Sequence, residues 1–260
     1  MPLGFARNLF TYYDDLWSPQ LSLGTDLRMW LNPSDLTTVT FSGSNELTAI
    51  SDASNVGTSV NINNTPFKVF AESKVVIGFA HASNEFLSTG SFAIASGGNH
   101  WALFAGEINA PNNSKDSIWS FDTSSSPARD YAISASDASE FQGELDLDGL
   151  SSNRISSNAG NLIDFTSGVN GASNPKIDPD TPFMCVCFFN KTGSEIGVRI
   201  NGSNAFNPET DYDNAIQTTA GMNIFRNRGS QSYGGQLWEF MVSQGLPGSG
   251  GTDMTKIEQA

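Results

Sequence analysis

Basic residues are scarce in this chain of 260 residues. Only 13 Lys and Arg stand against 27 Asp and Glu, which gives a formal net charge of −14, and no basic cluster interrupts the acidic balance. Nucleic acids and anionic membranes attract proteins through clustered positive charge. The composition therefore argues against both as partners.

Long apolar runs are missing as well. No stretch approaches the roughly 18 apolar residues of a membrane-spanning helix. The start, MPLGFARNLFTYYDDLW, has one Arg and no apolar segment followed by a small-residue cleavage site, so we do not expect it to act as a secretory signal. The expectation is a protein made and kept in the cytoplasm, or assembled there into a particle.

Cysteine and histidine are nearly absent, with two of each. Cys185 and Cys187 are two residues apart in an apolar run, so a strand would place both thiols on one face, where they are poorly placed for a mutual disulfide. We expect them to be reduced core residues. His81 and His100 have no further His or Cys at ligand spacing, which argues against a zinc site.

The chain is rich in short strand patterns that are separated by turns containing Ser, Asn and Gly. Residues 183–189 form an unbroken apolar run, and residues 195–200 alternate between apolar and polar, as strands covered on two faces and on one face do. Asn201 and Gly202 then suit a tight hairpin turn. Short runs of this kind recur along the chain without a long helix. The sequence predicts an all-β, two-sheet antiparallel sandwich.

The last predicted strand, residues 236–243, has an irregular apolar pattern. Leu237, Phe240 and Val242 do not fit one strict alternation, which predicts a β-bulge. Further on, Thr252 or Asp253 can cap a short terminal helix. Three tryptophans in strand patterns are expected in the core: Trp101, Trp119 and Trp238.

Three segments carry a family resemblance: LRMWLNPSDLTT (27–38), IGFAHASNEFLST (77–89) and GGQLWEFMVSQGLPGSGGTDMTKIEQA (234–260). In order and spacing they resemble the laminin G-like branch of the concanavalin A-like lectin/glucanase superfamily, in the form found in bacteriophage and marine viral proteins. The resemblance implies a single jelly-roll domain over residues 26–260. It implies no one activity.

From this resemblance we expect a non-enzymatic virion protein, either a capsid decoration protein or a subunit of a fibre or appendage. Such a protein would be assembled in the host cytoplasm and would use the sandwich as an exposed, lectin-like module. The alternative is a carbohydrate-binding module that recognises a cell-surface glycan from a tail fibre. Candidates for stacking on a sugar or contacting a partner are Trp17, Tyr131 and Tyr233.

Residues 1–25 are expected to form an N-terminal arm outside the sandwich, because their aromatic residues show no clean period. The arm either packs across its own domain or docks on another virion protein or a sister subunit in a homo-oligomer. Aromatic anchors are enriched in such interfaces. The docking candidates are Phe5, Phe10, Tyr12, Tyr13 and Trp17.

The segment 144–148 suggests a catalytic alternative, since a strand would place its three carboxylates on one face. It is similar to the E-x-D-x-E strand of laminarinase- and carrageenase-type glycoside hydrolases. By that analogy Glu144 is the nucleophile, Asp146 the helper and Asp148 the proton donor. Asp replaces Glu at the donor, and the outer Cα atoms lie about 13 Å apart where a retaining pair needs carboxyls about 5–5.5 Å apart. We therefore expect a solvated strand face and no enzyme.

No cofactor is expected, with calcium as the one candidate. Lectin-like jelly rolls often bind calcium in loops, and carboxylate oxygens are its preferred ligands. The weak candidates for such a site are Asp146, Asp148, Asp178 and Asp180.

Overall fold

The computed structural model describes residue 19 and residues 23–90, 92–93, 99–109, 116–122, 132–135, 143–146, 163–164, 180–190, 195–204, 209–210, 219–226 and 234–245. Regular structure in these ranges is almost entirely β-strand, with two short 3-10 turns, η1 (Gly24–Asp26) and η2 (His81–Ser83). Nothing helical in these ranges has the length and apolar character of a membrane span.

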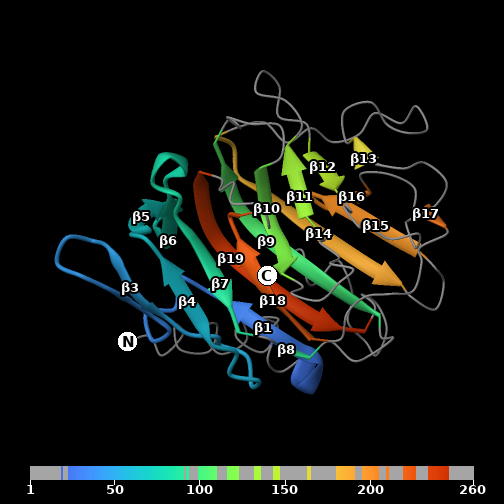
Figure 1. The fold of residues 1–260 in the computed structure, drawn as a ribbon, viewed down its shortest axis with the longest axis horizontal. Coiled ribbons are helices and arrows are strands. Elements are labelled where there is room, and N and C mark those ends of the chain that lie inside the picture. Colours follow the sequence, from blue (N-terminus) through green and yellow to red (C-terminus); the bar gives the residue numbers. More distant parts are fainter. Residues whose placement is uncertain are drawn as a thin grey trace, which may run out of the picture.

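Two antiparallel sheets form the layers of a sandwich (Figure 1), which confirms the predicted fold class. The first sheet has the order β16-β15-β14-β9-β19-β6-β5, with β1 beside β19 and β17 beside β15. Its strands are β1 (Leu27–Leu31), β5 (Phe67–Ala71), β6 (Lys74–Phe79), β9 (His100–Ile108), β14 (Phe183–Asn190), β15 (Glu195–Ile200), β16 (Ser203–Asn204), β17 (Glu209–Thr210) and β19 (Gly235–Gln244).

The second sheet has the order β13-β12-β11-β10-β18-β7-β4, with β8 beside β18, and a separate hairpin joins β2 to β3. These strands are β2 (Val39–Phe41), β3 (Leu47–Ile50), β4 (Val60–Asn63), β7 (Phe86–Thr89), β8 (Phe92–Ala93), β10 (Asp116–Asp122), β11 (Ala132–Ala135), β12 (Gly143–Asp146), β13 (Ile163–Asp164) and β18 (Thr219–Ile224).

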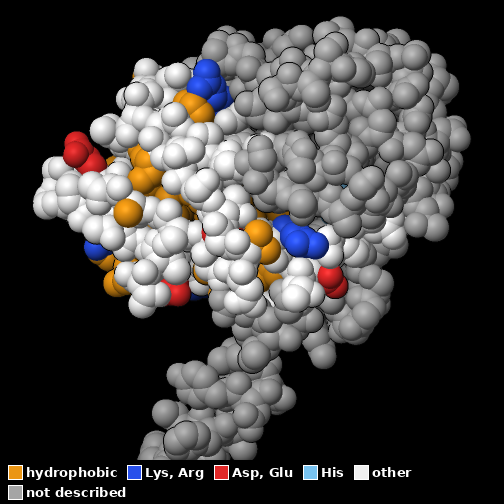
Figure 2. Space-filling view, turned by 60° about the horizontal axis from the view of Figure 1, so that its bottom comes forward, with side chains coloured by type: hydrophobic (Ala, Val, Ile, Leu, Met, Phe, Trp, Pro, Cys, Tyr) orange, Lys and Arg blue, Asp and Glu red, His pale blue; other side chains and the backbone are white. Residues whose placement is uncertain are grey.

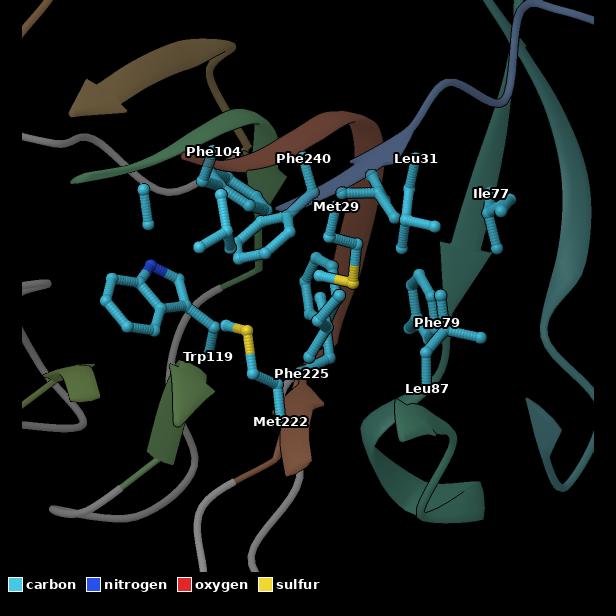
Figure 3. Packing of buried hydrophobic residues seen from close by; sticks show 14 of the residues in the cluster. Met29, Leu31, Ile77, Phe79, Leu87, Phe104, Trp119, Met222, Phe225 and Phe240 are labelled. Carbon is cyan, nitrogen blue, oxygen red and sulfur yellow. The ribbon is translucent and has the colours of Figure 1, made fainter. Parts of the chain in front are cut away.

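The main core lies between the two sheets. Figure 3 shows Phe104 and Phe240 of the first sheet on one side of this layer, with Trp119 of the second sheet facing them. The rings of Trp119 and Phe240 meet edge to face with centroids 6.1 Å apart. Phe79 and Phe225 stack at 4.4 Å. Edge-to-face and stacked contacts of this kind stabilise a core beyond the area that they bury.

The hairpin predicted around residues 183–204 is present. Strand β14 pairs with β15 from Asn190 opposite Glu195 to Cys185 opposite Ile200, and β15 continues into β16. Asn201 and Gly202 have φ of 48° and 78°, the left-handed conformation that a two-residue hairpin turn requires. The Asn-Gly pair therefore fixes the register of β15 against β16.

Cys185 and Cys187 are free thiols buried in the main core, as predicted. Their sulfur atoms lie 3.9 Å apart. Burial is the main reason why the pKa of the Cys187 thiol is raised well above its ordinary value. The pair acts as apolar filling of the core.

A second apolar cluster covers the opposite, outer face of the first sheet. Its members are Leu23, Leu27, Trp101, Leu103, Val186 and Met241. Central strands β9, β14 and β19 are thus buried on both faces, which explains the long apolar runs in their sequences. Trp101 is buried as predicted, but on this outer face and not between the sheets.

Candidate functional site

The segment proposed as catalytic is a strand over the part that the structure describes. Glu144 and Asp146 occupy alternate positions of β12, near the end of the second sheet. In the strand register, Glu144 stands opposite Ser134 on one neighbour and Asp164 on the other. Asp148 lies outside the described residues. The backbone thus places Glu144 and Asp146 two residues apart on one strand, and the roles of all three residues stay predictions.

Two of the four calcium candidates fall in described ranges. Asp146 is on β12, and Asp180 is an exposed turn residue with φ of 57° whose backbone N–H donates to the carbonyl of Ile108. Asp148 and Asp178 lie outside the described residues. In the ranges that the structure describes, no group of three or more His, Cys, Asp and Glu side chains is arranged to hold a metal ion.

The five docking residues of the arm, and the candidates Tyr131 and Tyr233, also lie outside the described residues. Two later residues of the arm are described. Pro19 is buried, and Leu23 belongs to the second apolar cluster of its own domain. The predicted terminal helix lies beyond the last described residue, Gly245.

The bulge predicted in the last strand is present and contains a half-buried tryptophan. The register of β19 against β9 shifts between Leu237 and Glu239. Leu237 and Phe240 both face the main core, so the two residues between them, Trp238 and Glu239, both lie on the outer face of the first sheet. The prediction that Trp238 lies in the core is wrong, because Trp238 directly follows the core residue Leu237 and its half-buried side chain lies on the opposite face of the sheet.

The side chain of Glu239 accepts a hydrogen bond from a tryptophan indole. The Nε1–H of Trp30 on β1 donates to Glu239 Oε1 over 2.6 Å. Burial raises the pKa of the Glu239 carboxyl, while the Trp30 hydrogen bond and the charge of Lys74 act in the opposite direction. Glu239 is therefore a carboxylate kept in a poorly solvated place by specific partners.

A row of side chains crosses four strands next to this pair. Phe67 on β5 stands opposite Gly78 on β6, which stands opposite Gln236 on β19, which stands opposite Glu107 on β9. Gln236 Nε2 donates to Glu107 Oε1 over 3.2 Å. A Cβ at Gly78 would collide with the Phe67 ring, so this ring lies over the outer face of the first sheet.

The row lies in a region of negative charge. Burial raises the pKa of the Glu107 carboxyl, and the negative charge of Asp180 raises it further. Gln236 Oε1 and Trp238 Nε1 are buried atoms without a hydrogen-bond partner. An acceptor and a donor are thus left unsatisfied beside a carboxylate and two aromatic rings.

We name this surface the outer-face patch. It consists of Trp30, Phe67, Glu107, Gln236, Trp238 and Glu239. Sequence reasoning missed it, because its residues come from four strands that are far apart in the chain. The one signal was the tryptophan and glutamate between two core positions of the last strand. Figure 2 shows that charges are sparse on the described part of one molecular face, where hydrophobic side chains lie among uncharged polar ones.

Comparison with known proteins shows the fold. No family model matches the chain, and no curated protein matches it. Among solved structures, it is similar to domain 4 of AbnA, a GH43 extracellular arabinanase from Geobacillus stearothermophilus, in complex with arabinotriose. That likeness has 13% identity and a TM-score of 0.56, and it covers 85% of this chain and 93% of that domain.

Two further likenesses involve longer proteins. The binding domain of botulinum neurotoxin serotype G is 10% identical with a TM-score of 0.53, and the match covers 88% of this chain and 49% of that one. The sialidase of Trypanosoma rangeli, in complex with the inhibitor DANA, is 8% identical with a TM-score of 0.55, and the match covers 97% of this chain and 36% of that one. All three agree with a β-sandwich fold, and the chain spans at most about half of the two longer proteins.

Proposed function

We propose that this chain is a non-catalytic β-sandwich module that binds carbohydrate. The observation that carries the proposal is the likeness to domain 4 of the arabinanase, which extends over 93% of a domain solved with arabinotriose. The outer-face patch adds support, because ligand sites combine aromatic side chains with a few placed polar groups. Here the aromatic side chains are Trp30, Phe67 and Trp238, and the polar groups are Glu107 and Gln236.

A glycan array probed with the full chain tests this function. Binding to at least one class of oligosaccharide is the expected result, and a parallel array in EDTA shows whether calcium takes part. The absence of binding on both arrays would overturn the proposal.

We further propose that the module serves in a bacteriophage particle, as a capsid decoration protein or as a fibre or appendage subunit that carries the glycan-binding surface. The support is the resemblance of residues 27–38, 77–89 and 234–260 to viral laminin G-like proteins. The aromatic residues of the 1–25 arm would provide attachment to another virion protein or sister subunit. Deleting residues 1–18, which keeps the buried Pro19 and Leu23, should abolish incorporation into particles and leave glycan binding intact. Retained incorporation would contradict the role of the arm.

The absence of catalysis is part of the proposal and has its own test. The wild-type chain should release no reducing sugar from laminarin or carrageenan. If it does, and if Glu144→Gln abolishes the release, the chain is a glycoside hydrolase that uses β12 and the proposal of a binding module is wrong.

A further inference from the structure

We infer that the outer-face patch binds a neutral oligosaccharide along the row formed by Phe67, Gln236 and Glu107. This inference rests on the proposed function. It adds the place of the site and the charge class of the ligand.

The aromatic end of the row is Phe67. Its side chain is 39% exposed. The ring lies over Gly78, where the absence of a side chain leaves room for it, and Val69 packs against the same glycine. The ring is therefore fixed in place while part of its surface faces solvent. A fixed, exposed aromatic surface suits the apolar C–H face of a sugar.

The polar part of the row begins two strands away. Gln236 and Glu107 stand side by side on β19 and β9, joined by their hydrogen bond. At the usual spacing of neighbouring strands, three strand-to-strand steps separate Phe67 from Glu107 by about 14 Å. A ligand that contacts both ends must be longer than one sugar ring. The row therefore fits an oligosaccharide.

Unsatisfied groups beside the row match sugar hydroxyls. Gln236 Oε1 lacks a donor, and Trp238 Nε1 lacks an acceptor. A hydroxyl group can both donate and accept a hydrogen bond, so hydroxyls of one glycan can satisfy both atoms once these half-buried side chains shift to meet them. Buried polar atoms without a partner are rare in native structures, so each one calls for an explanation.

The charges of the patch select against anionic glycans. Glu107 and Asp180 already repel each other, and the whole chain carries a net charge of −14. A sulfated or sialylated sugar would bring a further negative charge close to these two carboxylates. Lys74 is near the patch, and its charge acts on Glu239 at the other end. Neutral glycans avoid this repulsion, and their hydroxyls can donate hydrogen bonds to both carboxylates.

Isothermal titration of the full chain with single oligosaccharides tests the inference. The neutral probes are arabinotriose, xylohexaose, cellohexaose and laminarihexaose, and the anionic probe is a heparin hexasaccharide. Wild type is expected to bind at least one neutral probe and not the heparin fragment. Phe67→Ala and Gln236→Ala should each lower the affinity for the neutral probe at least tenfold. Glu107→Gln, which keeps the shape of the side chain, should also weaken it.

Phe70→Ala is the matched control. Phe70 lies three residues along the same strand, on the opposite face of the sheet, and is 71% exposed. Its replacement should leave affinity unchanged. Circular dichroism spectra and melting temperatures confirm that each variant is folded.

The outcomes separate the two proposals. If wild type binds a neutral glycan and the three patch variants bind equally well, the site is wrong and the proposed function stands. If wild type binds the heparin fragment and Phe67→Ala abolishes this binding, the charge class is wrong. If wild type binds no probe here and no glycan on the array, the proposed function fails and the site fails with it.

Discussion

Trp30 and Glu239 are 209 residues apart in the chain, yet the indole N–H of one donates to the carboxylate of the other over 2.6 Å. The contact exists because β1, near the start of the chain, pairs with β19, near its end. It places a carboxylate on a half-buried part of the outer face.

Replacing Glu239 by Gln should change how stability depends on pH. Because the pKa of Glu239 is raised in the folded protein, the native state holds a proton that the unfolded chain has lost. This group therefore lowers stability as pH rises from the ordinary Glu value through the raised pKa, and the loss is complete above it. Glu239→Gln keeps an acceptor for Trp30 without the charge.

The measurement is urea unfolding of wild type and Glu239→Gln from pH 4 to pH 8. The variant should be more stable than wild type at pH 8, and the difference should shrink as pH falls toward 4. A constant difference across the range would show that the carboxyl is not desolvated. Glu85 and Glu107, whose pKa values are raised too, remain in both proteins and cancel in the comparison.

Removing the indole of Trp119 should be among the most damaging core changes. Trp119 is 1% exposed and packs edge to face on Phe240 across the sandwich. Truncating a buried aromatic side chain to alanine costs about 3–5 kcal/mol of unfolding free energy, because it leaves a cavity. Leu36→Ala is the control, since Leu36 is 61% exposed and its loss should cost less than about 0.5 kcal/mol. Equal losses in chemical denaturation would place Trp119 outside the core.

Gly106 should not tolerate a methyl group. A Cβ at this position would lie well inside the van der Waals distance of the Gln236 carbonyl oxygen and against the Phe104 ring. We expect Gly106→Ala to lower stability by about 1–3 kcal/mol through overpacking. Gly43→Ala has open space around the new Cβ and should be close to neutral. Melting temperatures of the two variants give the comparison, and a harmless Gly106→Ala would contradict the strand pairing of β9 with β19.

Asp52 should prove important for the loop between β3 and β4. Its Oδ1 accepts hydrogen bonds from the backbone N–H groups of Trp30 and Ser54, and its Oδ2 accepts from Thr58 N–H and the Ser54 hydroxyl. Asp52→Ala should lower stability by about 2 kcal/mol, since bonds to a charged acceptor are lost. Asp52→Asn keeps the Oδ1 acceptor and should lose less. Hydrogen exchange at Thr58 should speed up in both variants, and unchanged exchange would argue against the anchoring role.

The two thiols should be unreactive in the native protein. Cys185 and Cys187 are 1% and 0% exposed, and the pKa of Cys187 is raised by burial, so thiolate is scarce. Ellman's reagent should modify neither residue in native buffer and both residues in 6 M guanidinium chloride. Rapid modification of the native protein would show that β14 opens readily.

Local sequence patterns predicted the strands well where a signal is confined to neighbouring residues. The apolar run of β14, the alternation of β15 and the Asn-Gly turn each determine their own backbone, and the structure confirms them. The bulge in β19 was also visible, because Leu237 and Phe240 break a strict alternation. The sequence did not show on which face Trp238 lies. The break in alternation indicates that a bulge is present, but it does not indicate which face each residue of the bulge occupies.

The sequence by itself determined an antiparallel two-layer architecture, since burial with a period of two is a property of short segments. The tertiary structure alone decided what lies on the outer face of the first sheet. The row from Phe67 through Gln236 to Glu107 and the contact of Trp30 with Glu239 depend on the register between strands that are distant in the chain. Register between distant strands is set by the packing of the whole core, and no local pattern contains it.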